Sequence, residues 1–186
     1  MRQSTKEAIA EALLDLLSDH TIEQITVKKL VEECGVNRQT FYYHFCDIYD
    51  LLEWALGHSI ELYLVENPFP SSDWRDKVRH LFHFLYQNRR KILHAYDQEN
   101  RKLYERFIIK MIRPIIEEKV DSIPAAQKVP PEKRKFVLKI FVWLYSSLFF
   151  EWLEEGMHDE NLTQLEDYFT VAEGGISAAL EKFLPE

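Results

Sequence analysis

The sequence predicts an all-helical protein. Only 5 Gly and 7 Pro are distributed over 186 residues, so few tight turns are required and long helices are favoured over many short strands. Apolar residues recur three and four positions apart in most segments, which is the period of a helix with one buried face. Hydrophobic residues make up 46% of the chain, which suits a sizeable core. We therefore expect amphipathic helices packed around shared cores.

The N-terminal part predicts two short helices in succession. The first covers residues 5–18, where apolar residues repeat at helical spacing and Ser4 or Thr5 can serve as the N-cap. The second begins after Thr26, whose hydroxyl can accept a free N–H of the first turn. Gly35 follows the last apolar residue of this helix, where a left-handed C-terminal cap favours glycine.

A third helix is expected to begin after Asn37, another good N-cap. Phe41 and Phe45 lie one turn apart and should face inward, whereas Gln39 and Tyr43 point most directly away from them. Two helices joined by a glycine-containing turn, with a polar and aromatic outer face on the second, have the helix-turn-helix layout.

Residues 26–52 read TVKKLVEECGVNRQTFYYHFCDIYDLL and resemble the DNA-binding segment of TetR-family transcriptional regulators. The most diagnostic part is TFYYHF, which precedes an acidic, leucine-rich helix capped by Asp47. The resemblance implies an N-terminal three-helix helix-turn-helix domain, residues 1–47, and a C-terminal helical domain, residues 48–186, that binds an effector and dimerises. The pairing of FYYHFCDIYDLLEW with a late FFEWLEEGM is also similar to DhaS-type regulators, which are linked to dihydroxyacetone kinase operons.

The same resemblance implies which residues meet DNA. Arg38, Gln39 and Thr40 match positions that approach base edges, and Arg pairs with guanine and Gln with adenine in the major groove. The positions expected at the phosphate backbone are Thr26, Lys28, Tyr42, Tyr43 and His44. A solvated helix face remains the alternative for Gln39 and Tyr43, and packing at the domain edge remains the alternative for His44.

The charge of the chain limits how it can bind DNA. The net charge is −8, and the first 55 residues contain five basic and ten acidic residues. Ile48 stands where the family often has a phosphate-binding Lys at the start of the fourth helix. DNA binding must therefore rest on a few placed contacts rather than on a general positive field. Arg2 and Lys6 would add contacts if the N-terminal segment lies along the minor groove.

The rest of the chain predicts four long helices, separated by Pro-containing connections. Their expected ranges are 74–95, 101–120 with a bend at Pro114, 136–153, and 162–184. The third of them is apolar nearly all round, so it must be buried on more than one side, and a partner chain is a natural second cover. TetR-like proteins dimerise through their last two long helices. The expected homodimer interface contains Phe141, Tyr145, Leu148, Phe149, Trp152, Phe169 and Ile176. An internal core of one chain is the alternative for these residues.

Several function classes lack support in the sequence. It contains no glycine-rich phosphate loop, serine-nucleophile motif or carboxylate-rich metal motif, so we expect no enzyme activity, no cofactor and no metal. The longest apolar run, 136–150, is shorter than the about 20 residues of a membrane span, and no apolar signal stretch begins the chain, so we expect a cytoplasmic protein.

The expected partners are a double-stranded DNA operator, a second copy of the chain, and a small-molecule or protein effector. Aromatic residues between 74 and 107 either line an effector pocket or form plain core. The alternative function is an adaptor or co-regulator of the same fold that binds a protein instead of DNA.

Overall fold

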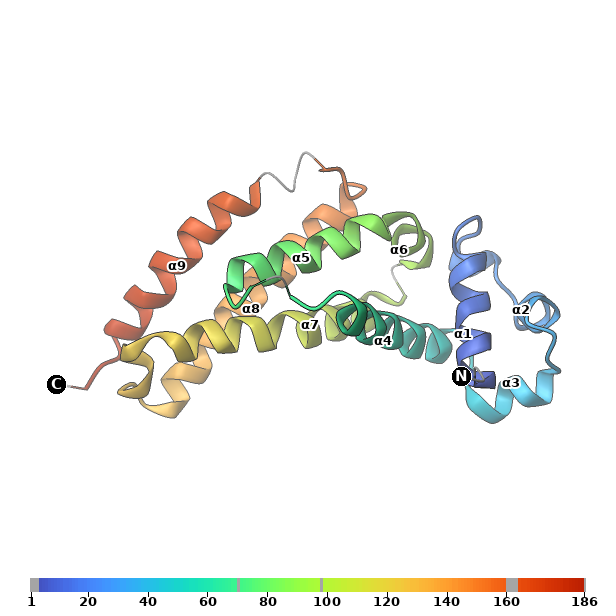
Figure 1. The fold of residues 1–186 in the computed structure, drawn as a ribbon, viewed down its shortest axis with the longest axis horizontal. Helices are drawn as coiled ribbons and strands as arrows, with labels where there is room; N and C mark the ends of the chain where they lie inside the picture. Colours follow the sequence, from blue (N-terminus) through green and yellow to red (C-terminus); the bar gives the residue numbers. More distant parts are fainter. Residues whose placement is uncertain (1–3, 70, 98, 160–163, 186) are drawn as a thin grey trace. The chain divides into compact units, whose positions relative to one another are not determined.

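The structure, a computed structural model, describes residues 4–69, 71–97, 99–159 and 164–185. Within these ranges every regular element is a helix, which confirms the predicted all-helical fold (Figure 1). The α-helices are α1 Thr5–Leu16, α2 Val27–Glu33, α3 Arg38–His44, α4 Ile48–Glu66, α5 Trp74–Gln87, α6 Arg89–Ala95, α7 Arg101–Ser122, α8 Pro131–Glu154 and α9 Leu165–Glu181. Short 3-10 turns occupy Ile22–Gln24 and Pro124–Gln127.

The chain divides into two compact units, which are described separately. The first contains the residues up to Pro68 together with Asn88–Phe107, so it holds α1 to α4, α6 and the beginning of α7. The second contains Phe69–Gln87 and the residues from Ile108 onward, so it holds α5, most of α7, α8 and α9. The expected division at residue 47 is a functional one and stays a prediction.

The first unit begins with a capped helix. Ser4 caps α1 by a reciprocal pair of bonds, in which the Glu7 N–H donates to Ser4 Oγ at 3.3 Å and the Ser4 N–H donates to Glu7 Oε2 at 2.8 Å. α1 packs against both α2 and α4. The buried side chains of this unit include Ile9, Leu13, Leu17, Leu30, Phe41, Phe45, Leu51 and Leu52.

The helix expected over residues 74–95 is broken, and this expectation was wrong. The backbone leaves the helical region at Asn88, with φ −99° and ψ 10°, so that α5 ends and α6 begins as a separate helix. Contacts of α6 with the end of α1 explain the break. The His94 ring nitrogen Nδ1 lies 2.7 Å from the carbonyl oxygen of Leu17, and Arg90 pairs with Asp19 at 3.0 Å.

Two further contacts hold the first unit together. The Tyr49 hydroxyl on α4 donates to Asp97 Oδ2 at 3.0 Å, and Arg106 on α7 pairs with Glu53 on α4 at 3.0 Å. Burial, followed by the hydrogen bond to Asp97 and its negative charge, raises the pKa of Tyr49 to about 12. The segment 88–107 therefore belongs to the same packed body as the helix-turn-helix.

The second unit is built around α8. This helix begins at Pro131, earlier than the expected residue 136, because Pro is favoured in the first turn of a helix and Glu132 suits the positive end of the helix dipole. α8 packs against α9, where the glycine Gly175 allows a close approach: a Cβ built there would lie 3.1 Å from Phe141 Cζ. α7 continues through Pro114 as one helix. The expected start of the last helix, Leu162, lies outside the described residues.

Among the helices of the described residues, only α8 has both the length and the apolar composition of a helix that could cross a membrane. However, 56% of its most apolar window is buried inside the protein. A core helix of a helical domain has the same property, so α8 does not indicate a membrane span.

Candidate nucleic-acid interface

The α2–turn–α3 segment is built as its capping residues predict. Thr26 Oγ1 accepts the N–H of Lys29 at 3.2 Å, and Asn37 Oδ1 accepts the N–H of Thr40 at 2.8 Å. Gly35 between them has φ +67°, and the N–H of Val36 donates to the Val31 carbonyl at 3.1 Å. The turn thus closes in the left-handed conformation that glycine adopts without a Cβ penalty.

α3 has one buried and one exposed side. Phe41 is completely buried and Phe45, which follows the helix, is only 2% exposed. On the opposite side Tyr43 is 84% exposed and Tyr42 is 58% exposed, although large aromatic side chains are usually at least partly covered. Two exposed tyrosines beside Gln39 give α3 a flat polar and aromatic surface with no core function.

The structure brings the expected DNA-contacting residues onto the α2–α3 surface. Arg38, Gln39, Tyr42, Tyr43, Thr26 and Lys28 are exposed, whereas Thr40 and His44 are half-buried. The His44 ring packs edge to face with Tyr43, with centroids 5.0 Å apart. His44 therefore supports the outermost tyrosine as well as lying near the expected phosphate position.

The two threonines differ in what their hydroxyls can still offer. Thr26 accepts a backbone N–H, so its own hydroxyl hydrogen remains available for a phosphate oxygen. The Thr40 hydroxyl donates to Asn37 Oδ1 at 3.1 Å, so only its lone pairs and its methyl group are left for a base. Thr40 is thus suited to an apolar contact with a thymine methyl group or to accepting a hydrogen bond.

The start of α4 is closed by carboxylates. Asp47 Oδ1 accepts the N–H of Asp50 at 2.8 Å, and Asp50 Oδ2 accepts the N–H of Cys46 at 2.8 Å. The Asp50 N–H in the first turn of α4 is therefore already paired, and two negative charges lie at a helix N-terminus that could otherwise face a phosphate. Ile48 is half-buried and supplies no charge. The carboxylates of Asp47 and Asp50 therefore oppose a phosphate contact at Ile48, which the sequence already put in doubt.

Lys6, for which a DNA contact was suggested, packs over aromatic rings of its own unit. Its ammonium nitrogen lies 4.6 Å from the centroid of the Trp54 ring and 5.2 Å from that of Phe45. A cation over an aromatic face is attracted by the ring quadrupole, so this lysine stabilises the contact between α1, the end of α3 and α4. The other suggested contact, Arg2, lies outside the described residues.

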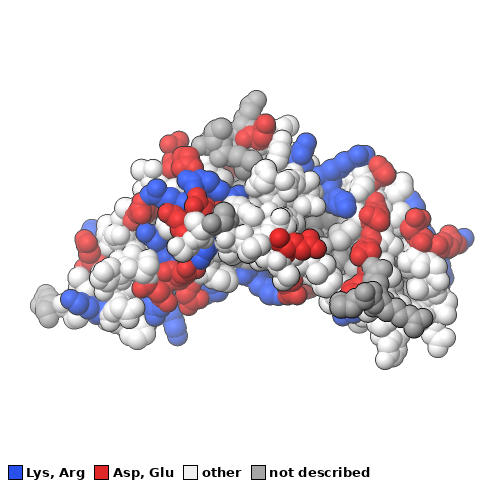
Figure 2. Space-filling view, viewed as in Figure 1, with Lys and Arg blue, Asp and Glu red and all other residues white. Residues whose placement is uncertain are grey.

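No broad basic surface is seen on the face drawn in Figure 2, where acidic and basic side chains are interspersed. On α2, Lys28 lies 3.9 Å from Glu32 in an exposed pair that salt screens easily. Neutral donors and a few cations must therefore make the contacts of the α2–α3 surface with any polyanion.

The residues expected at a homodimer interface are mostly covered by their own chain. Phe141, Tyr145, Phe149, Trp152, Phe169 and Ile176 are buried, and Leu148 is half-buried. Tyr145 packs edge to face with Trp74, and Trp152 stacks on Phe82 with ring centroids 5.5 Å apart. Helical periodicity therefore identified the apolar residues of α8 correctly, but in the structure these residues pack against α5 and α9 of the same chain. The exposed large apolar residues of α8 are Phe136, Ile140 and Trp143.

Comparison with known families decides the identity of the fold. Residues 5–55 match the profile of the bacterial regulatory proteins of the tetR family, and residues 72–170, more than half of the chain, match the profile of a TetR-type transcriptional regulator C-terminal region. The chain belongs to the TetR family. It is therefore a transcriptional regulator rather than an enzyme, as the α2–α3 resemblance implied.

One curated relative and one solved structure are similar to this chain. The HTH-type dhaKLM operon transcriptional activator DhaS of Lactococcus lactis subsp. lactis (strain IL1403) is 27% identical over 105 residues, which cover 56% of this chain and 49% of that protein. The match thus spans about half the length of that relative. The solved structure of a dihydroxyacetone kinase operon activator DhaS superposes with a TM-score of 0.64 at 18% identity, covering 97% of this chain and 98% of that one. This second likeness shows the shared fold.

Sequence reasoning missed the residues that support the site from a distance. His94, Arg90 and Arg106 join α6 and α7 to the TetR-type helix-turn-helix, and each bonds to a residue more than 50 positions away. A single sequence carries no signal for such pairs, because only local spacing is visible in it. Among the described residues, no group of three or more His, Cys, Asp and Glu side chains could hold a metal ion.

Proposed function

We propose that this TetR-family protein regulates transcription by binding an operator duplex as a homodimer, with α3 in the major groove. The observation that carries the proposal is the outward face of α3, where Tyr43 is 84% exposed opposite the buried Phe41. A recognition helix of a helix-turn-helix must expose polar side chains at this place and hold its other side rigidly in the core.

The roles of the side chains follow from their chemistry. Arg38 and Gln39 stand in the exposed first turn of α3, where bidentate hydrogen bonds to guanine and adenine edges are possible. Thr40 accompanies them as an acceptor or methyl contact. Tyr42 and Tyr43 carry hydroxyls that donate to phosphates without adding charge. Thr26, Lys28 and His44 complete the set of backbone contacts in our proposal.

DNA binding is tested by fluorescence anisotropy with labelled duplexes tiled across the DNA upstream of the protein's own gene. We expect Gln39→Ala and Tyr43→Ala each to weaken the specific complex, since loss of one good contact costs about 1–3 kcal/mol per half-site. Glu11→Ala is the matched control, because Glu11 is an exposed residue of α1 on the same unit. Helical content by circular dichroism should be unchanged in all three variants.

Unchanged affinity of both α3 variants would refute the assignment of the recognition helix. Complete absence of binding by the wild-type protein at low salt would instead favour the adaptor function, which the carboxylates at the start of α4 and the acidic balance of the first unit also suit. Capture of a protein partner through the α2–α3 surface would then be the activity to pursue.

The homodimer is proposed to form on the faces of α8 and α9 that the chain leaves open. Phe136, Ile140 and Trp143 are 52%, 44% and 53% exposed on α8. On α9, Val171 is 67% exposed and a Cβ at Gly174 would meet no atom within 4 Å, so that a second helix can approach closely. Phe136, Ile140 and Trp143 recur at helical spacing along α8, and clustered exposed apolar side chains commonly mark an interaction site.

The dimer is tested by replacing one exposed and one buried tryptophan. Trp143→Glu should give a folded monomer in sedimentation velocity, because the side chain is on the open face. Trp152→Glu should instead lower the melting temperature severely, because that ring is buried against Phe82. A wild-type protein that sediments as a monomer at micromolar concentration would refute the proposed interface.

The similar L. lactis protein is a transcriptional activator of the dhaKLM operon, and we propose activation as the mode of this chain as well. A reporter driven by the chain's own upstream DNA should lose expression when the gene is deleted. Increased expression in the deletion strain would identify a repressor. We also propose that the protein acts in the cytoplasm, where its operator DNA is, and that an effector bound to the second unit controls it.

A further inference from the structure

One stripe of side chains stays exposed along most of α8. Its members follow one another at intervals of three or four positions, so they lie on one face of the helix. They are Lys133, Phe136, Ile140, Trp143, Ser147 and Glu151, and all six are exposed. The stripe therefore begins with a cation, carries its large apolar side chains in the middle, and ends with an anion.

The order of residues in this stripe is self-complementary. If a second copy of α8 lies antiparallel on it and crosses at the level of residue 142, each member meets the one about equally far on the other side. Lys133 and Glu151 are each nine positions from this level, so opposite charges meet at both ends. Phe136 is six positions away and Ser147 is five, so a large side chain meets a small one.

Antiparallel packing also fills the centre of the contact. Ile140 and Trp143 lie two positions and one position from the crossing level, so these two side chains of each copy pack together there. Such a contact, in which one residue meets a second and the second meets the first, is the isologous contact of a two-fold dimer. Parallel packing would instead place Lys133 against Lys133 and Glu151 against Glu151.

The charge around the stripe favours the same orientation. Residues 128–139 contain five basic residues and one acidic residue, whereas residues 140–181 contain nine acidic residues and no Lys or Arg. The ammonium nitrogen of Lys133 lies 5.2 Å from the centroid of the Phe183 ring, which keeps this cation at the surface of the α8–α9 pair. Glu151 has no cationic partner among the described residues. Each end of the stripe thus carries a charge that a second copy can balance.

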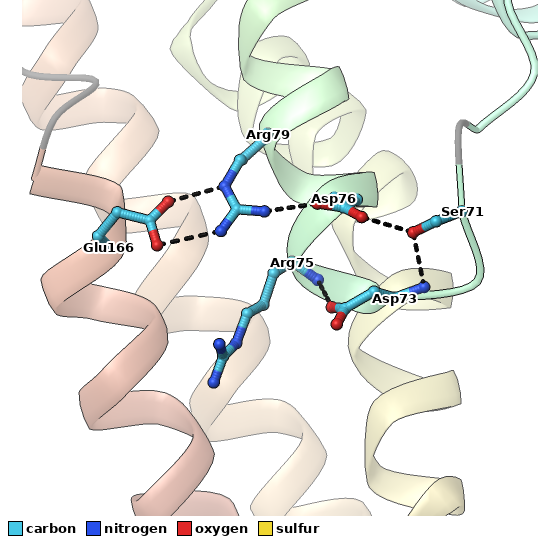
Figure 3. Close-up of polar contacts among 6 residues, drawn as sticks. All are labelled: Ser71, Asp73, Arg75, Asp76, Arg79 and Glu166. Atoms are coloured by element: carbon cyan, nitrogen blue, oxygen red, sulfur yellow. Dashed lines mark hydrogen bonds and ion pairs between the residues drawn. The ribbon is translucent and has the colours of Figure 1, made fainter.

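Two carboxylates of α9 are already paired within the chain and do not belong to this surface. Figure 3 shows Glu166 facing Arg79 of α5, whose Nε and Nη2 donate to the two carboxylate oxygens at 2.7 and 3.0 Å. The hydrogen bonds from this guanidinium hold the pKa of Glu166 below its usual range. Glu173 accepts hydrogen bonds from Arg75 of α5 and, at 3.1 Å, from Lys119 of α7. These ion pairs hold the inner side of α9 against its own chain.

We propose that the homodimer forms by antiparallel packing of this stripe on the same stripe of a second copy, with Lys133 beside Glu151 of the partner subunit. The inference rests on the proposed homodimer and adds its orientation and register. The apolar centre supplies most of the affinity, because exposed ion pairs contribute little. The charged ends select the orientation, since like charges placed opposite one another disfavour the parallel arrangement.

Disulfide cross-linking tests the orientation. In a background with Cys34→Ser and Cys46→Ser, a chain that carries both Phe136→Cys and Ser147→Cys should oxidise to a covalent dimer. Ser147→Cys alone should not cross-link, because its two copies are roughly 15 Å apart along the helix, beyond the about 7 Å between Cα atoms that a disulfide spans. Cross-linking of Ser147→Cys alone would overturn the proposal. So would a double variant that sediments as a dimer but forms no covalent link.

Charge reversal tests the register. Lys133→Glu and Glu151→Lys should each weaken the dimer about tenfold in sedimentation equilibrium, because each creates two like-charge pairs, and the combination should recover to within about threefold of the wild type. Lys135→Glu is the matched control, since it reverses an exposed cation of the same turn outside the stripe and should leave the dimer unchanged. Equal weakening by Lys133→Glu and Lys135→Glu, or no recovery in the combination, would overturn the register. A monomeric wild-type protein would refute the homodimer itself, whereas a stable dimer that fails these tests refutes only the antiparallel pairing.

Discussion

Replacement of Ile48 by Lys should increase both the affinity for DNA and the sensitivity of binding to salt. In the wild-type protein few cations are available to the operator: Lys6 lies over two aromatic rings, and Lys28 is paired loosely with Glu32. If two or three cations per half-site reach phosphates, a dimer neutralises about four to six, and log K falls with log salt with a slope of about −4 to −5.

The Ile48→Lys variant adds one cation per half-site, so the slope should steepen by about 2. Between about 50 and 200 mM NaCl the variant then loses about tenfold more affinity than the wild type does. The half-buried position can accept the aliphatic stem of lysine while the ammonium group reaches solvent. Ile48→Met is the matched control, since it keeps the apolar volume and adds no charge.

The assay is anisotropy of a labelled operator duplex, titrated with each protein at five salt concentrations. An unchanged slope in Ile48→Lys would refute the placement of the start of α4 beside a phosphate. A wild-type slope steeper than about −9 would show that a basic surface beyond the α2–α3 segment takes part.

Three further outcomes are expected from single substitutions. Gly35→Ala should lower the free energy of unfolding by about 1–2 kcal/mol in urea denaturation, because φ is +67° at this turn; no loss would contradict the left-handed cap. Tyr49→Phe should remove the phenol that titrates near pH 12 in absorbance measurements. Because the folded pKa lies above the ordinary value of about 10, the stabilising contribution of this hydroxyl, about 1 kcal/mol, should be present below pH 10 and lost as the pH rises towards 12; a variant that loses a phenol titrating near pH 10 instead of near 12 would contradict the bond to Asp97. Gly174→Ala should weaken the dimer in sedimentation equilibrium, because a Cβ there points into open space that the partner helix would occupy; a dimer unaffected by Gly174→Ala would place the partner elsewhere.

The helix-turn-helix could be predicted from the sequence because its determinants are local. Thr26, Asn37 and Asp47 each bond to a backbone N–H three residues on, and Gly35 adopts the positive φ that its place after α2 requires. The spacing of Phe41 and Phe45 also predicted correctly which side of α3 is buried. The domain is small and has a single core, so an apolar side of a helix in it can face only that core.

The second unit was harder to predict for a physical reason. α8 is apolar nearly all round, so its periodicity indicates burial without indicating what covers each side. Tyr145 and Trp152 look equally suited to a partner chain and to α5 of the same chain, and only tertiary packing distinguishes them. The break at Asn88 had the same origin, because the contact of His94 with the Leu17 carbonyl joins residues far apart in sequence.

The segment 88–107 has a consequence for how the protein is made. The first unit consists of two separate stretches of chain, and α5 lies between them in sequence but belongs to the second unit. During synthesis α1 to α4 leave the ribosome well before Arg90, His94 and Arg106, which brace α1 and α4. The nascent helix-turn-helix therefore lacks the contacts of Arg90, His94 and Arg106 while the ribosome adds some forty residues after α4. A fragment that ends after α4 would lack the same contacts, so its folding would report on this intermediate rather than on the complete first unit.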